Sequence, residues 1–135
     1  MKLSPEDADE NTLMFSMVSS ESDLQICMIL NRVLNISLAM AGDVIVKRKS
    51  GQIHFRKYIF ENEDMVEKYI LFSNYSGGEY LFPELKKNDF LLYINTEAVM
   101  TVIEERITQL KILPEISGVF KIDPSRIKSF HKIMF

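Results

Sequence analysis

Apolar and polar residues follow two different periods along this chain, and the changes of period predict where its helices and strands lie. Leu13–Val18 is short and mostly apolar, which predicts a strand. From Ile26 onward, apolar residues recur three and four positions apart, which is the spacing of one helix face. We therefore predict a helix over about Glu21–Asn35, with Ser20 as its N-cap and Asp23 in the position of a capping-box acid.

The middle of the chain alternates apolar and polar residues, as a strand with one buried face does. Two arms rich in Val, Ile, Phe and Tyr, residues 43–49 and 52–60, flank Ser50-Gly51. Glycine supplies the positive φ that a tight turn needs, so this segment predicts a β-hairpin. In the second arm we expect one face to lie on the core, with Ile53, Phe55 and Ile59. The other face is expected in solvent, with His54, Arg56 and Tyr58.

Three further strands are predicted in the second half of the chain. Glu67–Tyr75 is a strand that the turn Ser76-Gly77-Gly78 ends. Asp89–Ile94 is almost wholly apolar and suits a central strand covered on both faces. Gly118–Ile122 is the last strand, and Asp123-Pro124 then predicts a short helical turn.

A second helix is predicted between the last two of these strands. Asn95 or Thr96 is its expected N-cap, and Pro114 ends it. Its apolar face carries residues at helical spacing, namely Val99, Ile103, Ile107 and Leu110.

The predicted order of elements is strand, helix, four strands, helix, strand, and this order indicates the fold class. Right-handed crossovers place both helices on one face of a mostly antiparallel sheet. We therefore predict an α+β two-layer sandwich, ferredoxin-like with an inserted hairpin. A single domain spans residues 13–135, and the acidic, polar residues 1–12 are expected to be disordered. The apolar tail Ile133-Met134-Phe135 is expected to pack on the domain.

Composition narrows the classes of function. The net charge is −3, which argues against generic nucleic-acid binding because that function usually needs a basic field. Cys27 is the single cysteine, so a single chain has no internal disulfide or cysteine-based zinc cluster. The start has no apolar signal core, and no apolar run reaches the roughly 18 residues of a membrane span. We therefore expect a cytoplasmic protein without membrane contact.

A proline and a carboxylate, a two-lysine spacer and an aspartate precede the apolar strand, in the run Phe82-Pro83-Glu84-Leu85-Lys86-Lys87-Asn88-Asp89-Phe90. This run resembles the signature of the IPExxxVDY family of small bacterial proteins, found chiefly in Bacteroidetes. Pro83, Glu84 and Asp89 match it outright, whereas Phe82, Asn88 and Phe90 replace Ile, Val and Tyr. The resemblance extends to the Gly-containing lead-in at 73–78, to Cys27 and Asn31, and to the C-terminal segments 127–129 and 133–135. It implies no activity.

Two carboxylates of this motif are the first candidates for chemistry. Glu84 and Asp89 near a strand entrance could bind a cation or act as acid and base. Turns, however, favour bonds from side chains to the backbone. We therefore predict that Pro83, Glu84 and Asp89 shape the backbone, with Asp89 accepting N–H bonds at the strand start and Glu84 fixing the turn.

Other reactive residues give no recognisable catalytic or cofactor site. His54 and His131 are too few and too far apart for a zinc site, so no metal or cofactor is expected. Cys27 lies among apolar helix residues and is predicted to be a buried thiol. Gly77-Gly78 predicts a plain turn, because no helix start or phosphate-binding motif follows it. The catalytic residues, if any, are unknown.

Two classes of function stay open. A basic hairpin at 47–49 and 56–57 either contacts RNA or an acidic protein, or is a solvated edge that discourages strand pairing; nucleic acid is the less favoured partner. We prefer a non-enzymatic interaction or regulatory module, with a protein partner or a second copy at a sheet edge or helix face. Arg48, Arg56 and Lys128 are its candidate surface contacts. The alternative is a small-molecule-binding or enzymatic domain that uses Glu84, Asp89 and Lys128.

Overall fold

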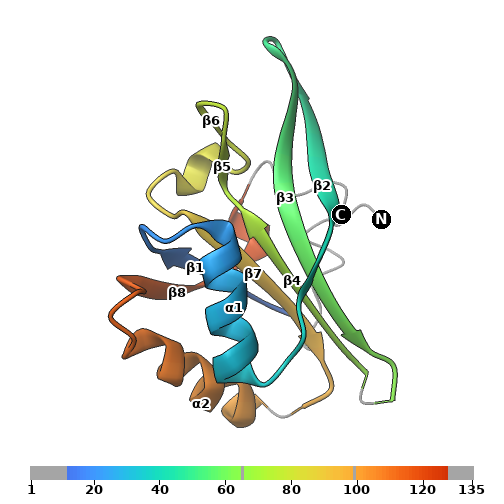
Figure 1. Ribbon diagram of the computed structural model, residues 1–135, viewed down its shortest axis with the longest axis vertical. Coiled ribbons are helices and arrows are strands. Elements are labelled where there is room, and N and C mark those ends of the chain that lie inside the picture. The colour runs from blue at the N-terminus through green and yellow to red at the C-terminus, as the bar shows by residue number, and fades with distance from the viewer. Residues whose placement is uncertain (1–11, 65, 99, 128–135) are drawn as a thin grey trace.

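The computed structural model describes residues 12–64, 66–98 and 100–127, which form an α+β fold with two α-helices (Figure 1). The elements in chain order are β1 (Thr12–Val18), α1 (Asp23–Leu34), β2 (Ala39–Arg48), β3 (Gly51–Asn62), β4 (Glu67–Ser73), β5 (Tyr75–Ser76), β6 (Glu79–Tyr80), the 3-10 turn η2 (Pro83–Leu85), β7 (Phe90–Thr96), α2 (Met100–Lys111), β8 (Gly118–Ile122) and the 3-10 turn η3 (Pro124–Arg126). Within these residues, neither helix is long and apolar enough to cross a membrane.

Six strands form one sheet in the order β2-β3-β4-β7-β1-β8, and each neighbouring pair is antiparallel. The apolar strand β7 lies between β4 and β1, so its prediction as a central strand is confirmed. The strands β2 and β8 are the two edges of the sheet. The predicted α+β class and the antiparallel sheet are thus confirmed, and β8 has the bounds predicted for it.

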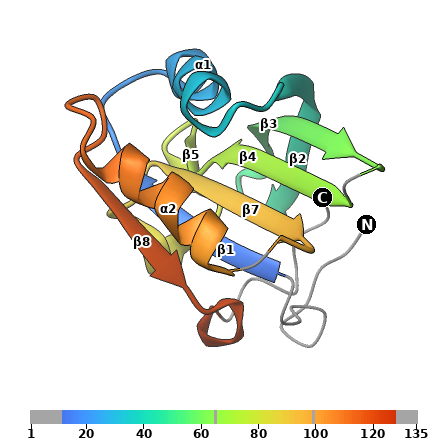
Figure 2. The same cartoon turned by 90° about the horizontal axis from the view of Figure 1, so that it is seen from below.

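The strand side chains alternate between two apolar clusters, one on each face of the sheet. Both helices pack on the same face, as Figure 2 shows, because each carries an apolar stripe at helical spacing. The opposite face is covered by the segment after β6 and by the residue that follows η3. The first cluster includes Phe15, Leu30, Tyr58, Leu92 and Ile107; the second includes Met14, Phe55, Ile70, Phe82, Leu91 and Ile127.

Helix α1 begins two residues later than predicted. Its N-cap is Ser22, whose hydroxyl oxygen accepts the N–H of Gln25 at 3.2 Å. The prediction of Ser20 was wrong because the preceding Ser19 anchors a loop: its hydroxyl donates to the carbonyl of Glu115 at 2.6 Å and accepts the N–H of Glu21 at 3.1 Å.

The hairpin β2–β3 is longer than predicted, because β2 begins at Ala39. A bulge between Met40 and Asp43 allows the ladder to continue past the point where the alternation of residues breaks. Tyr58 was expected in solvent, but it is almost fully buried. The predicted alternation of side chains holds. Tyr58 is nevertheless buried because it is part of the apolar cluster between the sheet and the helices.

The other corrections concern element ends. β4 ends at Ser73 instead of Tyr75, and a small hairpin of β5 and β6 follows, with its predicted turn at Gly77-Gly78. Asn95 and Thr96 are the last residues of β7 and not helix caps. The Thr96 hydroxyl instead accepts the N–H of Ala98 at 3.0 Å in the turn before α2. Val99, His131 and the C-terminal tail lie outside the described residues, as do residues 1–11; Thr12 already pairs in β1.

Candidate functional site

A polar groove of about 340 Å³ lies between the start of α1 and the β2–β3 hairpin. We call it the α1–hairpin groove. Its lining combines charged side chains with hydroxyl groups from the β4–β5 junction, namely Asp23, Asp43, His54, Arg56, Ser73, Tyr75 and Ser76.

Three elements position the charged residues of this groove. His54 and Arg56 are two positions apart on β3, so both face the side of the sheet that carries the helices. Asp43 on β2 is the cross-strand partner of Arg56. Asp23 is the first residue of α1, where the helix dipole favours a carboxylate.

The charged groups of the groove are paired with one another. Asp23 accepts a hydrogen bond from the Tyr58 hydroxyl at 2.9 Å and lies 3.5 Å from the Arg56 guanidinium. Asp43 lies 3.3 Å from Nδ1 of His54. Burial raises the pKa of Tyr58 to about 12, and the bond to Asp23 adds to the effect. Tyr58 is therefore a hydrogen-bond donor at neutral pH.

This geometry suits recognition better than catalysis. An Asp–His pair can serve as a general base, but it needs a nucleophile or substrate proton within hydrogen-bond reach. The Ser73 hydroxyl donates to the carbonyl of Tyr75 at 3.1 Å, which holds it in the β4–β5 turn. His54 and Asp43 are both substantially exposed, so neither has the dry environment that strengthens catalytic electrostatics.

Exposed apolar side chains lie on α1 and β2, the elements that also carry Asp23 and Asp43 of the groove. Leu24 and Met28 are four residues apart on α1 and are 54% and 57% exposed. Asn31, three residues beyond Met28 on the same helix, bonds the backbone of Leu38 in the connection to β2 through its side chain. Ile45 on β2 is 51% exposed. Apolar anchors beside paired charges are typical of protein-interaction surfaces.

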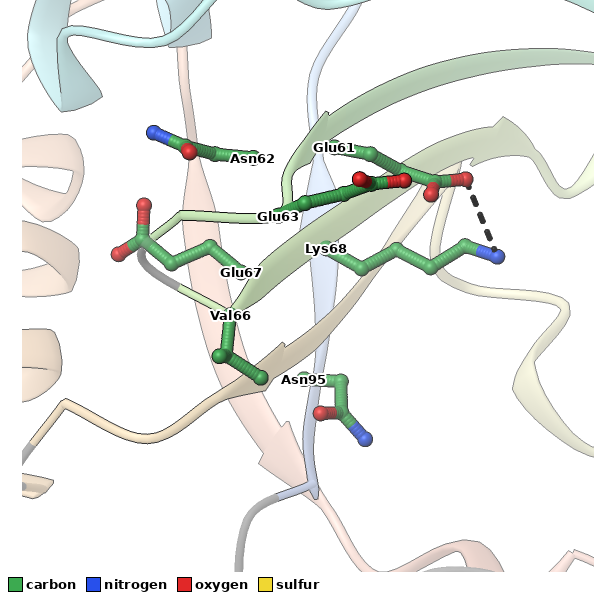
Figure 3. A pocket seen from close by; sticks show the side chains of 7 residues that line it. All are labelled: Glu61, Asn62, Glu63, Val66, Glu67, Lys68 and Asn95. Atoms are coloured by element: carbon green, nitrogen blue, oxygen red, sulfur yellow. Dashed lines mark ion pairs between the residues drawn. The ribbon is translucent and has the colours of Figure 1, made fainter.

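A second cavity, of about 310 Å³, lies at the β3–β4 turn and is rich in carboxylates. Figure 3 shows its lining, which consists of Glu61, Asn62, Glu63, Val66, Glu67, Lys68 and Asn95. Lys68 neutralises Glu61 at 3.5 Å, and Arg106 lies 3.7 Å from Glu67. Among the described residues no group of three or more His, Cys, Asp or Glu side chains is arranged to hold a metal.

The motif residues lie in the loop that leads into β7. Pro83 begins η2, and Glu84 is exposed on it. The Asp89 carboxylate accepts the N–H of Ser19 at 2.9 Å, which is the kind of backbone contact predicted for it, and its own N–H donates to the carbonyl of Met17. Neither carboxylate lines the two cavities above, and Lys128 lies outside the described residues. Of the three residues of this candidate site, the structure thus describes Glu84 and Asp89, both in this loop and neither at a cavity described above.

Asn74 is the organising residue that the sequence analysis missed. Its side chain is fully buried directly after β4. Oδ1 accepts the N–H of Phe82 at 2.8 Å, while Nδ2 donates to the carbonyls of Leu85 at 3.0 Å and Asn88 at 2.9 Å. An asparagine between a strand end and a Gly–Pro-rich loop is a weak signal for such side-chain-to-backbone bonds.

The two described surface-contact candidates differ. Arg48 lies 3.0 Å from Glu79 and donates to the carbonyls of Tyr80 and Leu81, so it ties the hairpin to the motif loop. Arg56 is well exposed at the groove. Cys27 is buried as predicted, and burial raises the pKa of its thiol, with Asp23 adding to the effect. A protonated, buried thiol is a poor nucleophile.

No protein-family model matches this chain, and a search of curated proteins finds no match either. The resemblance to the IPExxxVDY family thus stays a prediction.

Proposed function

We propose that this chain is a non-enzymatic protein-interaction module that contacts its partner through the α1–hairpin groove and the adjoining edge strand β2. The observation that carries the proposal is the composition of this surface. It holds the Asp23–Arg56 ion pair and the Asp43–His54 contact, with exposed Leu24 and Met28 on α1 and exposed Ile45 as the cross-strand partner of His54. Such a surface supplies apolar anchors for a partner, together with polar groups that fix its orientation.

The alternative, a small-molecule or enzymatic site at Glu84, Asp89 and Lys128, receives less support. The Asp89 carboxylate is engaged by the N–H of Ser19, and the loop that carries it is held by Asn74. A carboxylate committed to a backbone donor at a strand start acts as a structural group.

The proposal includes a fold and a family. If the β2–β3 hairpin is set aside, the remaining strands have the order β4-β7-β1-β8, with a helix after β1 and another after β7. This order supports a two-layer, ferredoxin-like fold with an inserted hairpin. The run 82–90 supports membership of the IPExxxVDY family, and a single buried, unpaired cysteine is compatible with a cytoplasmic location. A regulatory role is part of the same proposal.

The test is quantitative co-purification of the tagged full chain from cells of its own organism. The groove variant L24K/M28K places charge on two exposed positions, and I112K, at a residue that is 79% exposed at the end of α2, is the matched control. Partner proteins should be recovered with the wild type and with I112K. With L24K/M28K we expect the recovered amount of these proteins to be lower by about tenfold or more. Equal recovery with all three chains, each with an unchanged thermal melt, would contradict the proposal.

A further inference from the structure

The edge strand β2 has an outer side on which no other described strand pairs. It spans 10 residues, whereas the opposite edge strand β8 spans 5. An exposed edge presents a row of backbone donors and acceptors that can pair with another strand. β2 is therefore the longer template for strand addition on this sheet.

The ladder with β3 determines which backbone groups of β2 point outward. Arg48 and Gly51 flank the two-residue turn and pair with each other, so they form a hydrogen-bonded pair. The alternation of an antiparallel ladder then directs Val46 and Val44 toward β3. The same alternation directs the N–H and C=O groups of the residues between and beyond them, at positions 43, 45 and 47, toward the open edge.

The side chains of these three residues share one face of the sheet. Val44 is buried with Phe55 in the cluster opposite the helices. Asp43, Ile45 and Lys47 consequently lie on the helix side, and all three are exposed. Along the strand their side chains are acidic, apolar and basic in turn. A second copy that runs antiparallel presents basic, apolar and acidic side chains, which complement them.

An antiparallel twofold pairing of two β2 strands, centred on Ile45, sets each of these three residues opposite a complementary one. It places Asp43 opposite Lys47 of the partner subunit, twice by symmetry, and Ile45 opposite its own copy. A centre at Asp43 or Lys47 sets like charges against each other. A centre at Val44 sets Asp43 opposite Ile45 and Lys47 opposite Ala41. A centre at Val46 sets Lys47 opposite Ile45 and Asp43 opposite Lys49, which lies in the hairpin turn beyond the end of β2. The edge strand β8, with Gly118, Phe120 and Ile122 on one face, offers no such charge pair.

We propose that a second copy of this chain is a partner, and that it adds β2 to β2 antiparallel with the twofold axis at Ile45. The inference rests on the proposed interaction function and names its partner. The bulge between Met40 and Asp43 ends the regular strand at one side, which limits the pairing to a short segment and fixes its register. The grooves of both copies then lie on the same side of one continuous sheet.

Sedimentation equilibrium of the full chain, from about 1 to 500 µM, tests this pairing. We expect a dimer with a dissociation constant roughly in the micromolar range, because the paired segment is short. D43K and K47D should each weaken it by about tenfold or more, since two attractive pairs become two repulsive ones. The double variant D43K/K47D should restore the dimer, and a mixture of D43K with K47D should form a heterodimer.

Two controls separate pairing from folding. I45K places like charges at the twofold axis and should abolish the dimer, whereas I112K should leave it intact; both positions are exposed, so both variants should melt like the wild type. Added salt should weaken the wild-type dimer, because the ion pairs are exposed. Swaps at positions 43 and 47 that leave the dimer unchanged, or a double variant that fails to restore it, overturn the proposed register.

The outcomes also distinguish this inference from the proposed function. A wild-type chain that is monomeric at every concentration, yet loses a co-purified protein in L24K/M28K, overturns the second copy as partner and keeps the interaction module. If the wild-type chain is monomeric and L24K/M28K recovers the same proteins as the wild type, both the second copy as partner and the interaction module are overturned. A dimer that L24K/M28K disrupts and the charge swaps do not would place the interface on the helix face instead of the β2 edge.

Discussion

The substitution Asn74→Ala should destabilise this protein more than its single side chain suggests. It removes three hydrogen bonds to the backbone of Phe82, Leu85 and Asn88. The N–H of Phe82 is fully buried and has no water to replace the lost acceptor, whereas Leu85 and Asn88 are only half-buried, so their carbonyls can be rehydrated. With about 1 kcal/mol for each bond and up to about 3 kcal/mol for a buried orphan group, we expect a loss of about 3 kcal/mol.

Thermal and urea unfolding followed by circular dichroism measure this loss. For a chain of this length, about 3 kcal/mol corresponds to a fall in Tm of roughly 10 °C. Asn95→Ala is the matched control, because its side chain donates a single bond, to the Thr12 hydroxyl at 3.1 Å, and should cost at most about 1 kcal/mol. Hydrogen exchange should also show lost protection across residues 81–89, while the central strands keep theirs.

An Asn74→Ala variant that melts within about 2 °C of the wild type, with the loop amides still protected, would refute this expectation. That result would mean that apolar packing of Leu81 and Phe82 holds the loop without help from the amide. Asn74→Asp provides a further check. It keeps an acceptor for Phe82 but turns a carboxylate oxygen toward two carbonyls, so it should destabilise at least as much as the alanine variant.

Three further predictions follow from the same structure. Asp89→Ala should lower stability by about 1–2 kcal/mol in urea melts, because the backbone N–H of Ser19 loses its acceptor. Because the pKa of Tyr58 in the folded state is raised to about 12, this residue contributes stability that is complete below pH about 10 and is lost between pH about 10 and about 12. In Tyr58→Phe, the free energy of unfolding in urea should therefore fall less over this pH window. Removing residues 130–135 should lower the melting point, since burial of one phenylalanine ring is worth roughly 1.5–3 kcal/mol, and Ile127 before the tail is already buried; an unchanged melt would indicate a partner-binding tail.

Local sequence rules worked where one element's own pattern decides the outcome. The apolar run of β7 and the helical stripe of α1 are visible within a single element, and both were predicted correctly. The N-cap of α1 was misplaced because two serines satisfy the same local rule, and a contact from Ser19 to Glu115, 96 positions away, decides between them. The strand end at Asn95 was misread as a cap for the same reason: its side chain bonds Thr12 across the sheet.

The sequence by itself determined the class of fold, since the period of apolar residues decides which side of each element avoids water. It also determined that β2 reads acid, apolar, base on one face. Only the tertiary structure decided that β2 is an edge strand and that Asp23 meets Tyr58 and Arg56. The physical reason is that these facts depend on the order of strands in the sheet and on contacts between distant segments, which no local period encodes.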